Sequence, residues 1–232
     1  MMPFFLDYYS FADKIIIYDN MSSDNTLELI RKVGKIPRQG KTELHTYDTN
    51  DKFREDIQTI IRNTCWLKSK GIADWVIMVD VDEHVYHPDL ITFLKTAKTE
   101  KYTVLKADGY NMWSESFPKY GSRLTNQIKT GWAWAPQSKI SIFNPNEVSS
   151  MNYDAGFHKA NPVGNINMLV DGYKLLHYKL MGCEYFVNRN IECGRRLSRI
   201  NIEKGWSKHC LLSSGELVRM WNQGKKMATQ VF

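Results

Sequence analysis

The feature that most restricts the fold is an unbroken apolar run at residues 75–79, Trp-Val-Ile-Met-Val, which ends in Asp80-Val81-Asp82. A strand that is buried on both faces of a parallel sheet has such a run, because neither face carries alternating polar residues. The pattern therefore predicts a strand from Asp74 to Asp80 within a largely parallel sheet.

Segments on both sides of this run alternate between helical and extended patterns. In the first half we expect helices at 3–12, from residue 27, at 53–70 and at 88–98, and strands at 14–18, 44–47 and 103–107. Residues 110–170 combine turns with many aromatic residues and predict antiparallel strands and long loops, followed by helices at 183–204 and 214–224. This order predicts an α/β fold with a mixed, largely parallel sheet flanked by helices. We expect a single domain over 1–232, with halves at 1–108 and 109–232.

The chain carries a net charge of +6 at pH 7. A basic surface suits a nucleotide, a nucleic acid or an anionic membrane, and a solvated helix face would explain it equally well. The basic residues are not interleaved with aromatic residues as in single-strand binders, so no nucleic-acid partner is expected. No stretch reaches the roughly 18 apolar residues of a membrane-spanning helix, so no transmembrane segment is predicted.

The cysteines, Cys65, Cys183, Cys193 and Cys210, have no spacing typical of a zinc site or a disulfide framework. We interpret them as reduced thiols, which persist in the cytosol. The N-terminus has no basic region and Asp7 interrupts its apolar run, so it does not resemble a secretory signal. The resulting prediction is a cytoplasmic protein.

Asp80 and Asp82 lie at the end of the predicted strand, where ligands of parallel α/β sheets gather. If the chain stays extended through Val81, both carboxylates point to the same side, about one metal ion apart. Mg²⁺ and Mn²⁺ prefer oxygen ligands, and Mg²⁺ is often held by one or two carboxylates and substrate phosphates. A solvated turn is the competing explanation. The adjoining Glu83 and His84 favour a cation, because crowded carboxylates repel one another unless a positive charge compensates.

A second polar segment, residues 18–26, follows another predicted strand and leads into a helix. Ser23 or Asp24 could cap that helix. Asp19 and Asn20 precede the cap, and a carboxylate at a strand end can accept a hydrogen bond from a base N–H or a ribose hydroxyl. We therefore expect Asp19 to contribute to recognition of a nucleotide donor.

With these two segments the sequence resembles the family 2 glycosyltransferases and their GT-A-fold relatives, from about residue 4 to residue 215. The motifs that match are residues 11–26, residues 75–83 and Leu-Leu-His-Tyr-Lys at 175–179. The resemblance implies a GT-A type, Rossmann-like sheet and a metal-dependent hexosyltransferase. It also implies a nucleoside diphosphate sugar, with uridine as the base, and a glycan or other hydroxyl acceptor. The implied reaction is a single inverting displacement, with Mn²⁺ or Mg²⁺ on the diphosphate and a carboxylate as the base.

The resemblance also assigns residues to the donor. Asp19 would meet the nucleobase, with Asn20 and Asp24 beside it as donor-binding residues. Asp80, Val81 and Asp82 would bind the metal, ribose and diphosphate. His177 matches a late histidine that reaches back to the metal or diphosphate, although a structural role is as well supported. Lys179 and Arg62 are further candidates for phosphate contacts.

Two departures concern the rest of the site. Family members begin with a strand that helps to bind the base, whereas this sequence starts at the following helix. The family's Glu-Asp catalytic motif has no clear counterpart. Asp154, just before His158, is the candidate base, with Glu115 second, and a surface-loop carboxylate is the alternative for each. General-base geometry does not follow from sequence.

Two other functions use some of these residues. A metal-dependent phosphohydrolase or nuclease also needs paired aspartates, but usually gathers more carboxylates around two metals. A non-catalytic module that binds carbohydrate or nucleotide would keep the sheet without the chemistry. Incubation with a sugar nucleotide separates these possibilities.

Overall fold

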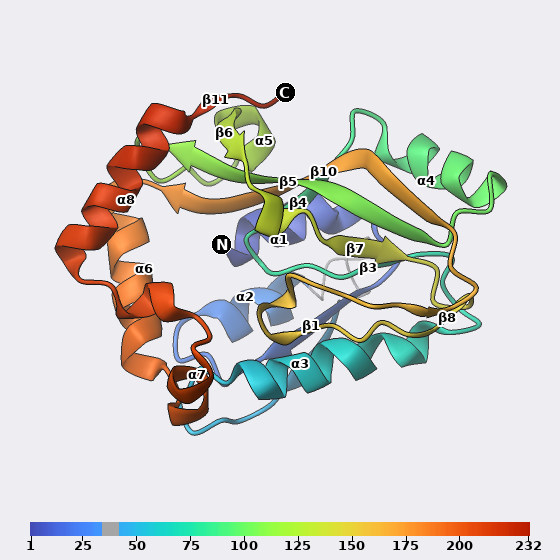
Figure 1. The fold of residues 1–232 in the computed structure, drawn as a ribbon, viewed down its shortest axis with the longest axis horizontal. Coiled ribbons are helices and arrows are strands. Elements are labelled where there is room, and N and C mark those ends of the chain that lie inside the picture. Colours follow the sequence, from blue (N-terminus) through green and yellow to red (C-terminus); the bar gives the residue numbers. More distant parts are fainter. Residues whose placement is uncertain (34–41) are drawn as a thin grey trace.

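The structure is a computed structural model that describes residues 1–33 and 42–232. It is a mixed α/β fold in which helices surround a curled seven-stranded sheet (Figure 1). The main path of the sheet has the order β11-β6-β5-β10-β4, and β7 pairs with both β5 and β3. The strands are β3 (Val76–Ile77), β4 (Glu83–Tyr86), β5 (Val104–Ser114), β6 (Thr130–Ala133), β7 (Ile140–Phe143), β10 (Met168–Met181) and β11 (Thr229–Gln230).

The sheet is mixed rather than largely parallel. Among the described strands of this sheet, only β5 and β10 run parallel, and the other pairings are antiparallel. The apolar run at 75–79 forms only the short strand β3, and its residues are half-buried rather than buried on both faces. The central position belongs instead to β5 and the long β10, a strand that the sequence pattern did not predict.

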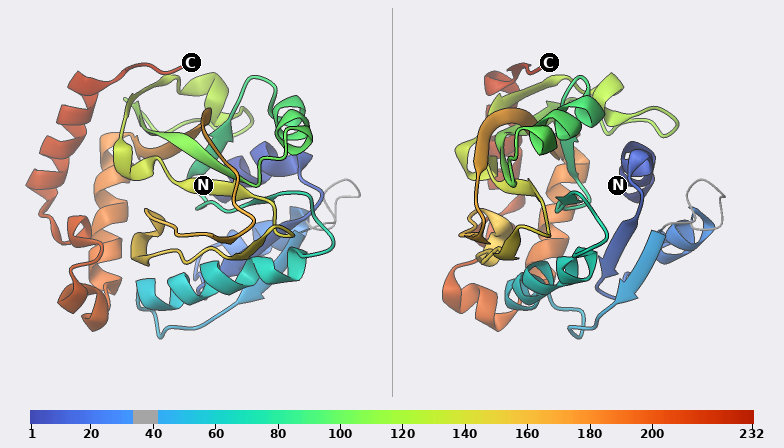
Figure 2. Two further views of the ribbon diagram at one scale, coloured as in Figure 1. Left: turned by 45° about the vertical axis from the view of Figure 1, so that its right-hand side comes forward. Right: turned by 90° about the vertical axis from the view of Figure 1, so that its right-hand side faces the viewer.

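A separate parallel pair lies beside this sheet. It consists of β1 (Ile15–Asp19) and β2 (Thr42–Thr46), and Figure 2 shows it at some distance from the larger sheet. A further small antiparallel pair joins β8 (Val148–Ser150) to β9 (Val163–Gly164). The strands predicted near 14–18 and 44–47 are thus confirmed, but the larger sheet does not include them.

Most predicted helices are present, and local signals explain their ends. Ser213 and Glu216 form a reciprocal capping box at the start of α8, and Asp89 caps α4 by accepting from Thr92 N. Gly205 ends α7 in the left-handed conformation that glycine favours. The helices are α1 (Met2–Tyr8), α2 (Thr26–Val33), α3 (Glu55–Thr64), α4 (Leu90–Thr99), α5 (Leu124–Gln127), α6 (Cys183–Arg196), α7 (Arg199–Lys204) and α8 (Ser214–Met227). Short 3-10 segments lie at Tyr9–Phe11, Cys65–Ser69, Ala135–Gln137, Ala155–Phe157 and Lys208–Leu211.

Apolar packing holds helices against the sheet. Tyr9, next to α1, and Leu94 of α4 pack with Val85, Leu105 and Leu175 of the central strands. At the other end of β10, α6 and α8 bury a second cluster of Leu180, Phe186, Leu217 and Trp221. This packing brings α6 close to the carboxyl end of β10, so side chains of α6 can reach the loops at that edge of the sheet.

The structure contains a disulfide between Cys193 in α6 and Cys210. The prediction of four reduced thiols is therefore wrong for this pair, because residues 17 positions apart meet only through the packing of the C-terminal helices. Gly194 permits the approach, since a Cβ there would lie 2.2 Å from the Cys210 carbonyl oxygen. Disulfides persist mainly in oxidising compartments, so the cytoplasmic prediction loses its main support.

Replacing both Cys193 and Cys210 by serine is expected to lower the free energy of unfolding by about 3 kcal/mol, because a disulfide that closes a loop of this length restricts the unfolded chain. Urea denaturation measures the loss. Cys183→Ser, which alters a free half-buried thiol, is the control and should change stability little. Alkylation of the denatured, unreduced protein should modify two thiols, Cys65 and Cys183. Modification of all four would contradict the disulfide.

No helix in the described parts of the chain is both long and apolar enough to cross a membrane.

Candidate functional site

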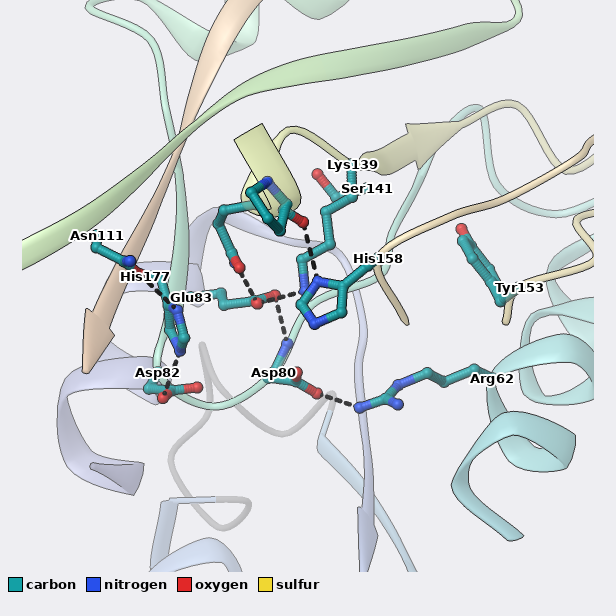
Figure 3. Close-up of polar contacts among 12 residues, drawn as sticks. Arg62, Asp80, Asp82, Glu83, Asn111, Lys139, Ser141, Tyr153, His158 and His177 are labelled. Carbon is teal, nitrogen blue, oxygen red and sulfur yellow. Dashed lines mark hydrogen bonds and ion pairs between the residues drawn. The ribbon is translucent and has the colours of Figure 1, made fainter. Parts of the chain in front are cut away.

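Asp80 and Asp82 lie in a tight turn between β3 and β4 rather than on an extended strand. The Glu83 N–H donates to the Asp80 carbonyl at 3.0 Å, which closes the turn. Asp80 Oδ1 accepts from Arg62 Nη2 at 2.5 Å (Figure 3), and Asp82 Oδ2 accepts from Arg189 Nη1 at 2.7 Å. The prediction of an extended segment is wrong, because the turn directs the two carboxylates to different arginines.

The two carboxylates differ in exposure but not in charge. The Asp80 side chain is 41% exposed, whereas the Asp82 side chain is 3% exposed. Burial opposes the ionisation of both groups. The charge of Arg62 nevertheless keeps the pKa of Asp80 below its usual value, and Arg189 and His177 keep the pKa of Asp82 well below it. Both groups are therefore anionic at neutral pH.

Glu83 is the third carboxylate, and it supports the turn from inside the protein. Its Oε2 accepts from the Asp80 N–H at 3.0 Å, and its Oε1 accepts from Gln137 Nε2 at 2.5 Å. The same Oε1 pairs with Lys139 Nζ at 2.6 Å, and both side chains are almost fully buried. The clustered carboxylates were expected to indicate a bound cation. In the structure, cationic side chains of the protein itself, Lys139 and two arginines, already compensate them.

The ring of His84 does not take part in the contacts of Asp80 and Asp82. It packs among aromatic side chains. Its ring stacks on Tyr8 with centroids 4.0 Å apart and meets the edge of Tyr178. Neither ring nitrogen has a hydrogen-bond partner among the described residues. Burial lowers the pKa of His84 to about 3, so the residue is neutral and structural.

His84 is expected to make stability depend on pH. The pKa of His84 is about 3 in the folded protein and near 6.5 in the unfolded protein. The contribution of His84 to the free energy of unfolding is therefore intact above pH 6.5 and is lost as pH falls from 6.5 towards 3. By pH 5 the loss is about 2 kcal/mol. His84→Phe keeps the ring stacking and should flatten the fall in unfolding free energy between pH 7 and 5. Equal slopes in both proteins, measured by urea denaturation, would refute this assignment.

His177 lies beside Asp82, where its predicted role requires it. The strand β10 pairs with β4 and β5, which places His177 opposite Glu83 on one side and Asn111 on the other. Its Nε2 is 3.1 Å from Asp82 Oδ2, and its Nδ1 is 3.2 Å from Asn111 Oδ1 (Figure 3). Asn111 therefore fixes the orientation of the ring that faces Asp82.

Two further basic side chains lie near His177. Lys179 follows two residues later on β10, and burial together with the charge of Arg189 lowers the pKa of its amine to about 8. His209 is half-buried in the segment Lys208–Leu211. Burial lowers its pKa to about 3, and the charges of Lys179, His177 and Arg189 act in the same direction. Arg189 and Lys179 thus supply positive charge beside Asp82, as a site for an anionic group would require.

The predicted donor residues on the first loop make local bonds. Asp24 Oδ1 accepts from Thr26 N at 3.0 Å, a local bond next to the first residue of α2. Asp19 is buried, and its Oδ2 accepts from Ser22 N at 2.8 Å. These hydrogen bonds stabilise the conformation of the loop between β1 and α2.

Tyr47 connects this loop to the Asp80 turn. Its backbone N–H donates to the Asp19 carbonyl at 3.0 Å. Burial raises the pKa of its phenol, and the negative charges of Asp19 and Asp80 contribute to the increase. Both carboxylates therefore lie near one phenol. Asn20 is bonded to Thr49 at 2.8 Å and holds the neighbouring segment.

The two predicted acceptor-side carboxylates lie apart from these contacts. Asp154 is exposed, and its Oδ1 accepts from Lys159 N at 2.9 Å. Glu115 pairs with Lys225 Nζ at 2.7 Å. Glu115 also lines a cavity of about 620 Å³, whose wall includes Arg189. The role of general base therefore stays a prediction for both Asp154 and Glu115.

The sequence did not indicate Asn111, Lys139 or Arg189 as site residues. Asn111 and Lys139 carry no signal in the sequence, because their roles depend on strand pairing and on a buried partner. Arg189 lies in the helix predicted at 183–204, and the sequence does not show its partner. The i, i+4 spacing from Tyr185 to Arg189 on a predicted helix shows which side chains share a face, but it does not show what that face contacts.

A model of the family described as Glycosyltransferase family 92 matches residues 4–214, which include the site residues described above. This is a different family from the family 2 enzymes whose motifs the sequence resembles. No curated protein matches the chain.

Proposed function

The chain belongs to glycosyltransferase family 92, and we propose that it moves a hexose from UDP-sugar to a hydroxyl group of a glycan or other acceptor. Residues 1–108 would form the nucleotide-sugar-binding half and residues 109–232 the acceptor-side half, from which His177 and Lys179 reach the diphosphate, in one domain with a fold of the GT-A type. Asp19, Asn20 and Asp24 would lie along the base and ribose.

The observation that carries the proposal is the arrangement of charge at the β3–β4 turn. Two ionised carboxylates lie among Arg62, Arg189 and Lys179, within a short distance of His177. A leaving diphosphate develops negative charge, and pre-positioned cations stabilise it without reorganisation. Arg62 and Lys179 are the proposed phosphate contacts.

Mn²⁺ or Mg²⁺ is the proposed cofactor. Asp82 Oδ2 and His177 Nε2 lie 3.1 Å apart and offer an oxygen and a nitrogen ligand, and Asn111 orients the imidazole from its other side. No group of three or more His, Cys, Asp or Glu side chains within residues 1–33 and 42–232 could hold a metal ion. Donor phosphates and water would therefore complete the coordination, as is usual for Mg²⁺. A bound ion would supply Lewis-acid stabilisation of the leaving group.

The reaction is proposed to be a single inverting displacement. A hydroxyl of the acceptor attacks the anomeric carbon while the bond to the diphosphate breaks, and the electron pair stays on the diphosphate. Arg62 and Arg189 pair with Asp80 and Asp82, and they would turn towards phosphate when a cation and the donor bind.

Thermal stabilisation by a panel of sugar nucleotides, with and without Mn²⁺, tests the proposal. A ligand at 100 times its Kd raises the unfolding free energy by about 2.7 kcal/mol. We expect UDP-sugars to stabilise the protein in a Mn²⁺-dependent way. No metal-dependent binding of any nucleoside diphosphate would contradict the proposal. Phosphate release without sugar transfer would favour a phosphohydrolase.

A further inference from the structure

The segment that leads into His158 has an uncommon backbone conformation. In the 3-10 turn Ala155–Phe157, Gly156 has φ 79° and Phe157 has φ 61°. A bulky residue is rarely found at positive φ, and it persists there only when the surroundings fix it. Such strain is concentrated at functional sites, so the contacts of this turn are informative.

Phe157 ties the turn to the cations of the carboxylate cluster. Its side chain is fully buried. Lys139 Nζ lies 4.4 Å from the ring centroid and Arg62 Cζ lies 5.1 Å from it. These are the groups that pair with Glu83 and Asp80. The position of His158, the next residue, is therefore set by the same cluster.

The segment Ala135–Gln137 also links His158 to the carboxylate cluster. His158 Nδ1 lies 2.9 Å from the carbonyl oxygen of Pro136, while the next side chain, Gln137, donates to Glu83. A carbonyl only accepts, so Nδ1 carries the proton and Nε2 of the neutral ring keeps its lone pair. The tautomer is the one that a base requires.

The His158 side chain is exposed. It is drawn among Asp80, Lys139 and Arg62 in Figure 3. Trp134 presents an edge-to-face contact to the imidazole, with centroids 6.1 Å apart, and an indole next to a base suits a sugar ring.

From these contacts we propose that His158 Nε2 is the general base of the transfer, which removes the proton of the acceptor hydroxyl. This inference rests on the proposed function. The proton passes to Nε2 as the acceptor oxygen forms its bond to the anomeric carbon. The bond from that carbon to the diphosphate breaks, with its electron pair on the leaving oxygen, and the imidazolium then loses its proton to solvent.

The decisive variant is His158→Asn, because the asparagine amide can still donate to Pro136 but cannot accept a proton. We expect kcat to fall by about 10²-fold or more, while stabilisation by UDP with Mn²⁺ stays as in the wild type. Release of UDP from the donor is measured with methyl hexosides and with water as acceptors. The matched control is His87→Asn, at a histidine whose contacts are Asp89 and Phe93, and it should keep kcat within a few-fold of the wild type.

A structural role for His158 is separated from catalysis by chemical rescue. Added imidazole should increase the rate of His158→Ala and leave the wild type unchanged. A His158→Asn variant with nearly wild-type kcat, or a His158→Ala variant that imidazole does not restore, would overturn the inference. Failure of the proposed function is a different result, because the wild type itself would then release no UDP.

Discussion

Asp80→Asn is expected to lower kcat/KM for sugar transfer by about 10²- to 10³-fold, the size of loss found when one group of a pre-organised electrostatic site is removed, because Asp80 holds Arg62 in place and would offer an oxygen to the proposed cation. Asp80 is the more exposed carboxylate of the triplet, and its pKa is held below the usual value by Arg62, so it is an anion under assay conditions. The substitution keeps the size of the side chain and removes its charge. Arg62 then has no carboxylate partner, and the site loses a group that approaches the metal and diphosphate.

The fold should tolerate this change, because the Asp80 side chain is partly exposed while its backbone N–H still donates to Glu83. The matched control is Asp74→Asn, at the start of the same chain segment, where the carboxylate pairs with Lys98 at 2.6 Å. Steady-state kinetics and urea denaturation are measured for both. Transfer by Asp80→Asn at the rate of the control would remove Asp80 from the site.

Lys139→Met is expected to reduce the unfolding free energy by about 3–5 kcal/mol, because it leaves the charge of Glu83 buried and unpaired. The two side chains are 3% and 1% exposed, and their charged atoms lie 2.6 Å apart. Water does not reach Glu83 to replace the lost partner. The geometry of the Asp80 turn should change as well, since the same carboxylate accepts from Gln137 and from the backbone of Asp80.

The double variant Glu83→Gln with Lys139→Met isolates the charge effect. It removes both charges, so much of the stability lost in Lys139→Met should return. Lys98→Met, at an exposed ion pair with Asp74, should cost far less, because exposed pairs contribute little. If Lys139→Met and Lys98→Met unfold at the same urea concentration, the buried pair does not have the assigned role.

Much of the helix order could be predicted from local pattern. The helices at 3–12, 53–70, 88–98 and 214–224 each have a counterpart in the structure, because apolar spacing and capping residues are local properties of the chain. Sheet topology could not be predicted in this way. The apolar run at 75–79 suggested a buried parallel strand, but buried strands and half-buried segments beside a sheet can share one composition.

The same distinction between local and long-range features applies to the site. The sequence placed acidic residues after a β-segment and a histidine at 177, and the structure brings His177 to Asp82. It did not indicate the turn at Asp80, where the backbone N–H donates to the buried carboxylate of Glu83. Nor did it pair Cys193 with Cys210.

The amino-acid sequence by itself determined which chemical groups are present, the order of most helices and the adjacency of Asp80, Asp82 and Glu83. Tertiary structure alone decided which cation meets each carboxylate. Arg62 comes from 18 residues before Asp80, Lys139 from 56 residues after Glu83 (139 minus 83), and Arg189 from 107 residues after Asp82. The physical reason is that backbone periodicity reaches only a few residues, whereas ion pairs over such separations form only when packing of the sheet and helices has already joined distant segments.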